Sequence, residues 1–272
     1  MSMDRIALVI SDVDGTLVDT QKRVTGRTRQ AVASLQAHGI GFTVVSSRPP
    51  FGLRPLIEAL GITAPVAAFN GGAIASPALN ILDQRSIDRA VAREIIAFLD
   101  AQKIGAWLFT GAEWLTRDPD GAHVAHETHT VQQGPHIVAD FDAVIDQGGK
   151  IVGVSDDFAR LEAIEKQAQS QFTGRAVAVR SQSYYLDFVA PGVDKGLAVR
   201  ELAKTIGVPF AQIVTLGDME NDVPMFHQAG FSIAMGNATD AVKRQAREAT
   251  LTNDEDGFAA AVEKFILPRA GG

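Results

Sequence analysis

The sequence contains no cysteine, so disulfide bonds and thiolate chemistry are both excluded. It also has no apolar run approaching the ~20 residues that a membrane-spanning helix needs. Its N-terminus lacks the charged and then apolar pattern of a secretory signal peptide. These absences predict a soluble cytoplasmic protein with no membrane partner.

An excess of basic residues is missing as well, because 25 Lys and Arg face 32 Asp and Glu, which gives a net charge of -7. Phosphate backbones bind basic surfaces, so this balance argues against nucleic acid as a partner. It leaves room for a small phosphate ligand, which responds to local charge. The 272 residues, 46% of them hydrophobic, are enough for one large domain or two ordinary ones.

Three short apolar segments end abruptly in polar side chains. In open α/β sheets ligands bind beyond the carboxyl ends of the strands, so we expect these side chains to gather at one site. For Asp12 and Asp14 the alternative without a function is a polar turn that closes the strand, since Asp and Gly are common in turns. The segments are residues 6–10 followed by Asp12 and Asp14, residues 41–45 followed by Ser46, and residues 212–216 followed by Asp218, Asn221 and Asp222.

The alternation of strands and helices is interrupted once along the chain. Strands and helices at short spacing up to residue 69 predict right-handed βαβ units and a parallel sheet. Residues 82–186 are α+β in character and lack strands that end in acids. We therefore predict an α/β core of residues 1–81 and 187–272, with 82–186 inserted as a second domain. Thr25 and Ser86 are expected to cap the helices that follow them.

Four carboxylates in one cleft would repel one another strongly, and a divalent cation resolves that repulsion. Oxygen ligands without His or Cys favour a hard ion, so we predict Mg²⁺ as the cofactor. A helix-capping role is the alternative for the last two of these acids. The four are Asp12, Asp14, Asp218 and Asp222.

The remaining groups suit phosphoryl transfer. Lys195 and Ser46 are expected to stabilise the equatorial oxygens of a phosphoryl group, where charge must be balanced. Asp12, held rigidly at a strand end, is the better candidate for a nucleophile that forms an aspartyl phosphate. Asp14, two residues on, is the better general acid and base. Taken alone, Lys195 would be an ordinary surface lysine.

A series of short motifs runs along the whole chain. Each motif alone is weak evidence for a family, but their combined order and spacing are highly specific. They are Asp12-Val13-Asp14-Gly15-Thr16, Ser46-Ser47-Arg48, Asn70-Gly71, Asp194-Lys195-Gly196, Gly217-Asp218-Met219-Glu220-Asn221-Asp222, Ala234-Met235-Gly236-Asn237-Ala238 and Asn253-Asp254-Glu255-Asp256-Gly257. In this order they resemble the haloacid-dehalogenase-like phosphatase superfamily, and specifically its Cof-type hydrolases.

The resemblance implies a Rossmann-like core and a mobile α/β cap over residues 82–186. The implied activity is Mg²⁺-dependent hydrolysis of a small phosphate ester, with a sugar phosphate favoured. Mg²⁺ would be held by Asp12, the backbone carbonyl of Asp14 and Asp218, with Asp222 in support. Implied substrate-binding residues are Ser46, Ser47, Arg48, Asn70, Gly71, Lys195 and Asn221.

One position departs from the family pattern. The second motif usually reads Thr-Gly-Arg, and here it reads Ser46-Ser47-Arg48. Ser46 keeps the hydroxyl. Ser47 adds a side chain, which bears on the loop conformation and on the room beside the phosphate.

Two other functions stay open at this point. A phosphotransferase or mutase would pass the phosphoryl group to another alcohol instead of water. A phospho-acceptor module or an inactive binding protein is the other possibility. Asp14 argues against the phospho-acceptor, because a long-lived acyl phosphate needs no group to activate water, and the filled catalytic positions argue against an inactive protein. The protein is expected to be a monomer or a homodimer.

Four histidines lie close together, at His123, His126, His129 and His136. A spacing of three residues can place histidines on one helical face, as in a transition-metal site. Nearby Pro and Gly and a weak helical periodicity favour a solvated loop instead.

Overall fold

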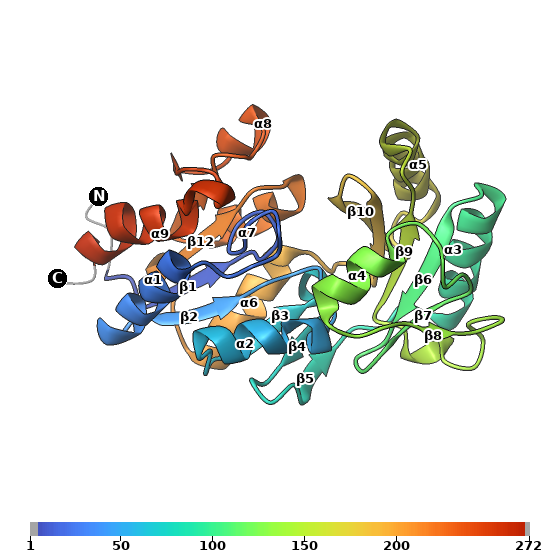
Figure 1. The fold of residues 1–272 in the computed structure, drawn as a ribbon, viewed down its shortest axis with the longest axis horizontal. Helices are drawn as coiled ribbons and strands as arrows, with labels where there is room; N and C mark the ends of the chain where they lie inside the picture. Colours follow the sequence, from blue (N-terminus) through green and yellow to red (C-terminus); the bar gives the residue numbers. More distant parts are fainter. Residues whose placement is uncertain (1–4, 270–272) are drawn as a thin grey trace.

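In a computed structural model, which describes residues 5–269, a parallel sheet forms the centre of one half of the molecule (Figure 1). Its five strands run in the order β14-β13-β12-β1-β2, and every neighbouring pair is parallel. This arrangement confirms the predicted α/β fold class. The strands are β1 (Leu8–Ser11), β2 (Gly41–Val44), β12 (Ile213–Gly217), β13 (Phe231–Ala234) and β14 (Glu248–Ala249).

Helices cover both faces of this sheet, because alternate residues of its strands point to opposite sides. Leu8 and Ile10 of β1 pack in one apolar cluster with α6 and α7, whereas Val9 packs in another with α1, α2 and α9. Thr25 caps α1 as predicted, accepting a hydrogen bond from the Thr28 amide. The helices are α1 (Gly26–Ala37), α2 (Arg54–Leu60), α6 (Lys195–Ile206), α7 (Val223–Gln228), α8 (Asp240–Lys243) and α9 (Gly257–Ala261).

The predicted alternation of strands and helices up to residue 69 ends in a further strand, which pairs mainly with a hairpin that was not predicted. A parallel bridge between Val45 and Ala67 ties it to the edge of the main sheet. The chain then reverses at Asn70 and Gly71, both with positive φ, and continues as antiparallel strands. The strands of this small sheet are β3 (Val66–Ala68), β4 (Ala73–Ala75) and β5 (Ile81–Gln84).

A six-stranded sheet from the middle of the chain forms the other half of the molecule (Figure 1). Along β6, Ala106 and Leu108 pack against α3 and α5, whereas Trp107 and Phe109 face the parallel-sheet half. The order is β10-β11-β9-β6-β7-β8. The elements are α3 (Arg89–Ala101), β6 (Gly105–Phe109), β7 (Trp114–Thr116), α4 (Val124–Val131), β8 (His136–Ile137), β9 (Lys150–Val154), α5 (Phe158–Gln171), β10 (Val177–Gln182) and β11 (Tyr185–Val189).

Two local predictions for this half were wrong. Asp88, not Ser86, caps α3, because its carboxylate accepts hydrogen bonds from the amides of Ala90 and Val91. The segment expected as a solvated loop contains helix α4. Packing outweighs its weak helical pattern, since α4 buries Val124 and Val131 against the body of the protein.

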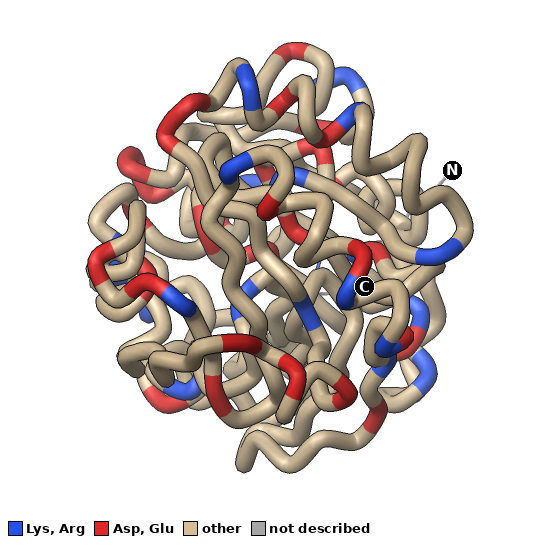
Figure 2. The backbone as a smooth tube through the Cα atoms, turned by 90° about the vertical axis from the view of Figure 1, so that its right-hand side faces the viewer, with Lys and Arg blue, Asp and Glu red and all other residues tan. Residues whose placement is uncertain are grey.

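Figure 2 shows the backbone from the side of this second half, with Lys and Arg positions scattered among Asp and Glu positions. Among the described residues, no helix combines the length and the apolar character needed to cross a membrane.

Candidate active site

Three carboxylates meet where β1 and β12 end. The two strands pair in parallel with Ser11 opposite Leu216, so Asp12 and Asp218 follow them side by side. Asp222 lies at the end of the short turn after β12. One carboxylate oxygen from each of the three acids lies within 4.8 Å of the others, and all three residues are buried. The topology thus brings Asp12 next to two acids that follow it by at least 206 positions in the sequence.

Two glycines make this approach possible. Gly15 has φ +89°, and a Cβ placed there would lie 2.4 Å from Asp218 Oδ2. A Cβ at Gly217 would lie 2.5 Å from the Cβ of Asp222. Any larger residue at either position would push the carboxylates apart.

Lys195 is the cation at the centre of the cluster. It starts α6, whose preceding residue Asp194 caps the helix through the Leu197 amide. Its Nζ lies 2.6 Å from Asp12 Oδ1 and also donates to Asp222 Oδ1. The lysine side chain is 3% exposed, so these ion pairs are shielded from water.

The three acids together outnumber this one lysine, and their pKa values reflect it. Burial raises the pKa of Asp12 to about 7; Lys195 opposes this rise and the Asp222 charge adds to it. Burial, with the charges of Asp12 and Asp222, raises the pKa of Asp218 well above its ordinary value. Uncompensated carboxylate oxygens in a buried site are what a hard divalent cation binds, so the residues present fit Mg²⁺.

Asp222 and Asp218 differ in how their oxygens are already used. Asp222 Oδ2 accepts hydrogen bonds from the amides of Asp218 and Met219 at 2.8 and 2.9 Å, and Oδ1 faces Lys195. Within the described part of the chain, Asp218 accepts hydrogen bonds from neutral donors only, Thr16 at 3.0 Å and Asn237 at 3.1 Å. Asp222 therefore shapes the loop, while Asp218 keeps charge available for a cation.

The Asp14 carboxylate lies apart from this cluster. Arg48 Nε and Nη2 each donate to it at 2.8 Å, and Lys22 Nζ lies 2.8 Å from Oδ1. Burial would raise the pKa of Asp14, but Arg48 and Lys22 outweigh it and hold that pKa well below its ordinary value. Arg48 also donates to the Thr130 carbonyl of α4, so it links this acid to the second half of the molecule.

The two serines of the second motif have different surroundings. Ser46 is buried, and its Oγ accepts a hydrogen bond from the Arg48 amide at 3.1 Å. Ser47 lines the small cavity beside Asp12 and Lys195, and its carbonyl accepts from Lys150 at 2.8 Å. Ser47 is not among the residues with positive φ, so the serine fits this loop without backbone strain.

Asn70 and Asn221 belong to a buried polar chain between the two halves. Asn221 Nδ2 donates to Asn70 Oδ1 at 3.2 Å, and Asn70 Nδ2 donates to Asp187 Oδ2 at 3.1 Å. Lys150 Nζ lies 3.5 Å from the same Asp187 oxygen. Neighbouring Gly71 has φ +98°, and a Cβ there would lie 2.6 Å from the Asp194 carbonyl oxygen.

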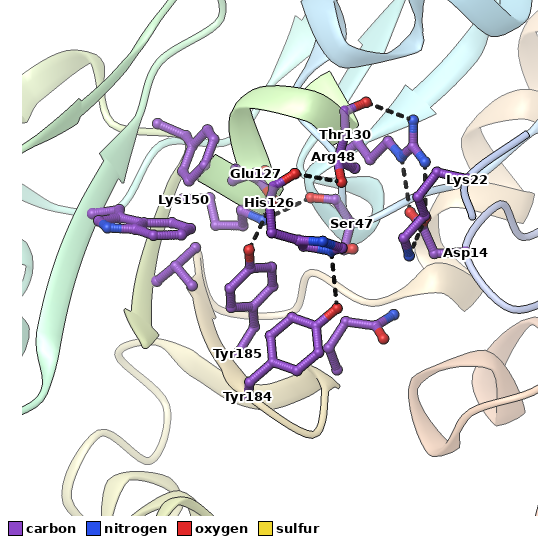
Figure 3. A pocket seen from close by; sticks show the side chains of 14 residues that line it. Asp14, Lys22, Ser47, Arg48, His126, Glu127, Thr130, Lys150, Tyr184 and Tyr185 are labelled. Carbon is purple, nitrogen blue, oxygen red and sulfur yellow. Dashed lines mark hydrogen bonds and ion pairs between the residues drawn. The ribbon is translucent and has the colours of Figure 1, made fainter. Parts of the chain in front are cut away.

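The second half adds residues that the sequence analysis missed. Ser181 and Gln182 of β10 line the cavity beside Asp12. A neighbouring pocket, shown in Figure 3, is lined from the second half by Trp107, Glu127, Lys150, Tyr184 and Tyr185, among others. One signal existed in the sequence: Asp187 is an acid inside the otherwise apolar and aromatic segment of residues 184–189.

The four histidines do not form a metal site. His123 stacks on Tyr184 with ring centroids 4.2 Å apart, and its Nε2 lies 2.8 Å from Asp156 Oδ1. His126 Nε2 lies 3.2 Å from the Tyr184 hydroxyl, so these rings form one wall of the pocket. Within residues 5–269, Asp12, Asp218 and Asp222 are the one group of acids or histidines close enough to share a metal ion.

Known proteins are similar to this chain in both sequence and fold. Phosphatase YwpJ of Bacillus subtilis is 27% identical over 285 residues, covering 95% of this chain and 99% of the relative. The 5-amino-6-(5-phospho-D-ribitylamino)uracil phosphatase YwtE of the same organism is 26% identical, covering 94% and 96%. The crystal structure of a haloacid dehalogenase-like hydrolase from Bacteroides thetaiotaomicron superposes with a TM-score of 0.84 at 29% identity, covering 96% and 99%.

The profile of the haloacid dehalogenase-like hydrolase family matches residues 9–262, which is nearly the whole chain and includes every motif described above. The chain belongs to the haloacid dehalogenase-like hydrolases.

Proposed function

We propose that this phosphomonoester hydrolase removes phosphate from a small phosphorylated metabolite through an aspartyl phosphate on Asp12, with Mg²⁺ as cofactor. The observation that carries the proposal is the buried cluster of Asp12, Asp218 and Asp222 around Lys195. A sugar phosphate is the favoured substrate class. The relative YwtE, named for a phosphorylated ribitylamino substrate, supports a polyol-bearing ester.

In the first step Asp12 attacks phosphorus, the bond from phosphorus to the leaving oxygen breaks, and Asp14 gives that oxygen a proton. In the second step Asp14 takes a proton from water, whose oxygen attacks phosphorus and frees Asp12 and inorganic phosphate. Lys195, Ser46 and Asn221 would contact the phosphoryl oxygens. Paired with Arg48 and Lys22, Asp14 is ionised, which is the form needed to activate water in the second step. In the first step Asp14 must carry a proton, so binding of the substrate has to weaken its pairing with Arg48 or Lys22.

Asp12 and Asp218 would hold Mg²⁺ through their carboxylates and Asp14 through its backbone carbonyl, with Asp222 in support. When bound, the ion supplies positive charge that offsets both the carboxylates and the phosphate oxygens. Residues 82–186 act as a cap that covers the site and contacts the leaving group. Ser181 and Gln182, which line the Asp12 cavity, are the parts of the cap nearest to this chemistry.

The test is release of inorganic phosphate from a panel of phosphorylated metabolites and 4-nitrophenyl phosphate, with Mg²⁺ or with chelator. We expect Mg²⁺-dependent turnover that falls at least about 10³-fold in Asp12→Asn, because the nucleophile is lost. Asp83→Asn, at an exposed acid of β5, is the matched control and should keep full activity. Turnover that survives Asp12→Asn contradicts the assignment of the nucleophile. Analysis of the products separates transfer to water from transfer to another alcohol.

A further inference from the structure

Glu127 is a buried acid that the proposed chemistry does not use. It lies in the first turn of α4, is 5% exposed, and points into the pocket between the two halves of the molecule (Figure 3). The pocket shares Asp14, Ser47 and Gln182 with the cavity beside Asp12. A leaving group attached to a phosphoryl group at Asp12 would therefore extend toward Glu127.

The Glu127 carboxyl has unusually little compensation for its burial. Tyr185 Oη donates to Oε2 at 3.1 Å, and within residues 5–269 this is its one side-chain hydrogen-bond donor. Burial raises the pKa of Glu127, against the opposing effects of Lys150, the Tyr185 hydrogen bond and Arg48. Burying a carboxyl group with a single neutral donor costs free energy, and a ligand that supplies another donor would recover part of it.

The cations around the pocket are already committed to other partners. Arg48 and Lys22 both bind the Asp14 carboxylate. Lys150 donates to the Ser47 carbonyl, lies 3.5 Å from Asp187 Oδ2, and sits 4.8 Å from the centroid of the Phe109 ring. A second anionic group on the substrate would have to compete with these partners for the three cations, and it would face Glu127.

A hydroxyl group suits this end of the pocket better than an anion does. Hydroxyls both donate and accept, so they match Glu127 whether or not it carries a proton. The aromatic wall formed by Trp107 and Tyr185, with ring centroids 5.3 Å apart, offers an apolar surface for the carbon chain. The cavity volume is about 20 Å³, little more than one water needs, so the side chains must separate to admit a leaving group.

We infer that Glu127 determines specificity by binding a hydroxyl of an uncharged, polyhydroxylated leaving group, with Tyr185 as its positioning residue. The inference rests on the proposed phosphatase function and narrows its substrate class. It favours polyol and sugar monophosphates over esters that carry a second phosphate or a carboxylate.

The experiment compares kcat/KM for glucitol 6-phosphate with kcat/KM for n-hexyl phosphate, which has the same carbon count and no hydroxyls. In wild type we expect the glucitol ester to be preferred. In Glu127→Leu that preference should fall about tenfold or more, the value of one hydrogen bond to a charged group. Glu127→Gln keeps the shape of the side chain and replaces the leucine variant if that variant fails to fold. Both Glu127→Gln and Tyr185→Phe should lower the preference for the glucitol ester less than Glu127→Leu does.

Glu94→Gln is the matched control, because Glu94 lies on α3 and pairs with Arg175 at the surface. This variant should keep the wild-type preference. An equal fall for both esters in the Glu127 variants would assign Glu127 a structural role and overturn the inference, as would an unchanged preference. Turnover in wild type without any preference for the glucitol ester overturns the inference alone. Failure to release phosphate from any ester overturns the proposed function with it.

Discussion

The acids of the site form two sets that differ in how their charge is balanced: the first is the buried cluster of Asp12, Asp218 and Asp222, and the second is the partly buried Asp14 alone. In the first set Lys195 contacts Asp12 and Asp222, and the pKa values of Asp12 and Asp218 are raised. Asp14, by contrast, has Arg48 and Lys22 to itself, and its pKa is held low. Burial alone therefore does not determine the pKa of these acids, because the number of cations beside each carboxylate also matters. The first set can accept another cation, whereas Asp14 is already neutralised by the protein.

The largest effect should come from removing the shared lysine. Lys195→Met leaves three buried carboxylates without a cation, so we expect the metal-free protein to lose about 3–5 kcal/mol in free energy of unfolding. Urea denaturation measures this loss. Lys166→Met, at a lysine that is 73% exposed in its pair with Glu162, should change stability by less than about 0.5 kcal/mol. Equal stability of the two variants would show that the core acids do not depend on Lys195.

The same comparison predicts how stability varies with pH. Because the folded-state pKa of Asp12 is about 7 and its ordinary value is 3.8, the folded protein binds more protons than the unfolded chain between these values. The stability that this group contributes is present below pH 3.8 and is lost as pH rises toward 7. In metal-free protein we expect the free energy of unfolding to fall over this range more steeply in wild type than in Asp12→Asn.

Equal slopes in the two proteins would contradict the raised pKa of Asp12. Asp14 does not confuse the comparison, because its pKa is depressed and its contribution is lost only as pH falls below its ordinary value. Repeating the titration with Mg²⁺ should flatten the wild-type slope, because bound cation favours the ionised carboxylates.

A smaller and more specific effect is expected at Asp14, whose charge is balanced by Arg48 and Lys22. Arg48→Gln removes two of the three ion-pair contacts of Asp14, so the pKa of Asp14 should rise. If Asp14 is the general acid and base, the limbs of the pH profile of kcat that report it move to higher pH. Lys22→Gln removes one contact and should shift them less. Identical profiles in wild type and Arg48→Gln would exclude Asp14 from proton transfer.

The smallest effect is expected at Ser47, where the family pattern has glycine. Its backbone does not need glycine, so Ser47→Gly should lower stability by about 0.4–1 kcal/mol, mainly by loosening the unfolded chain. We expect kcat/KM to change by less than about threefold. Chemical denaturation and steady-state kinetics check both values, and a gain in stability would indicate strain in the serine loop.

The sequence predicts the clustering of the first set of acids much better than it predicts the residues that line the pocket around Glu127. Asp12, Asp218 and Asp222 follow apolar strands, and parallel strands end at the same edge of a sheet, so local pattern and fold rules were enough. Glu127 of α4 and Tyr185 of β11 are 58 residues apart in the sequence and meet only in the folded protein. No local pattern marks such a pair.

The misplaced elements have similar causes. The α4 segment has weak helical periodicity, and it is helical because Val124 and Val131 bury apolar surface against the rest of the protein. The turn between β3 and β4 has positive φ at Asn70 and Gly71, a backbone conformation that an Asn-Gly pair permits but does not by itself predict. The predicted boundary between residues 81 and 82 falls inside β5, and the division into core and cap stays a prediction.

The most direct test of the difference between the two sets of acids is the thermal stability of wild type with and without Mg²⁺ at constant ionic strength. The account predicts that Mg²⁺ raises Tm in wild type and in Arg48→Gln, and that the rise is lost in Asp218→Asn. This readout does not depend on finding the substrate. A wild-type Tm that ignores Mg²⁺, or a rise that persists in Asp218→Asn, would contradict a cation site at Asp12, Asp218 and Asp222.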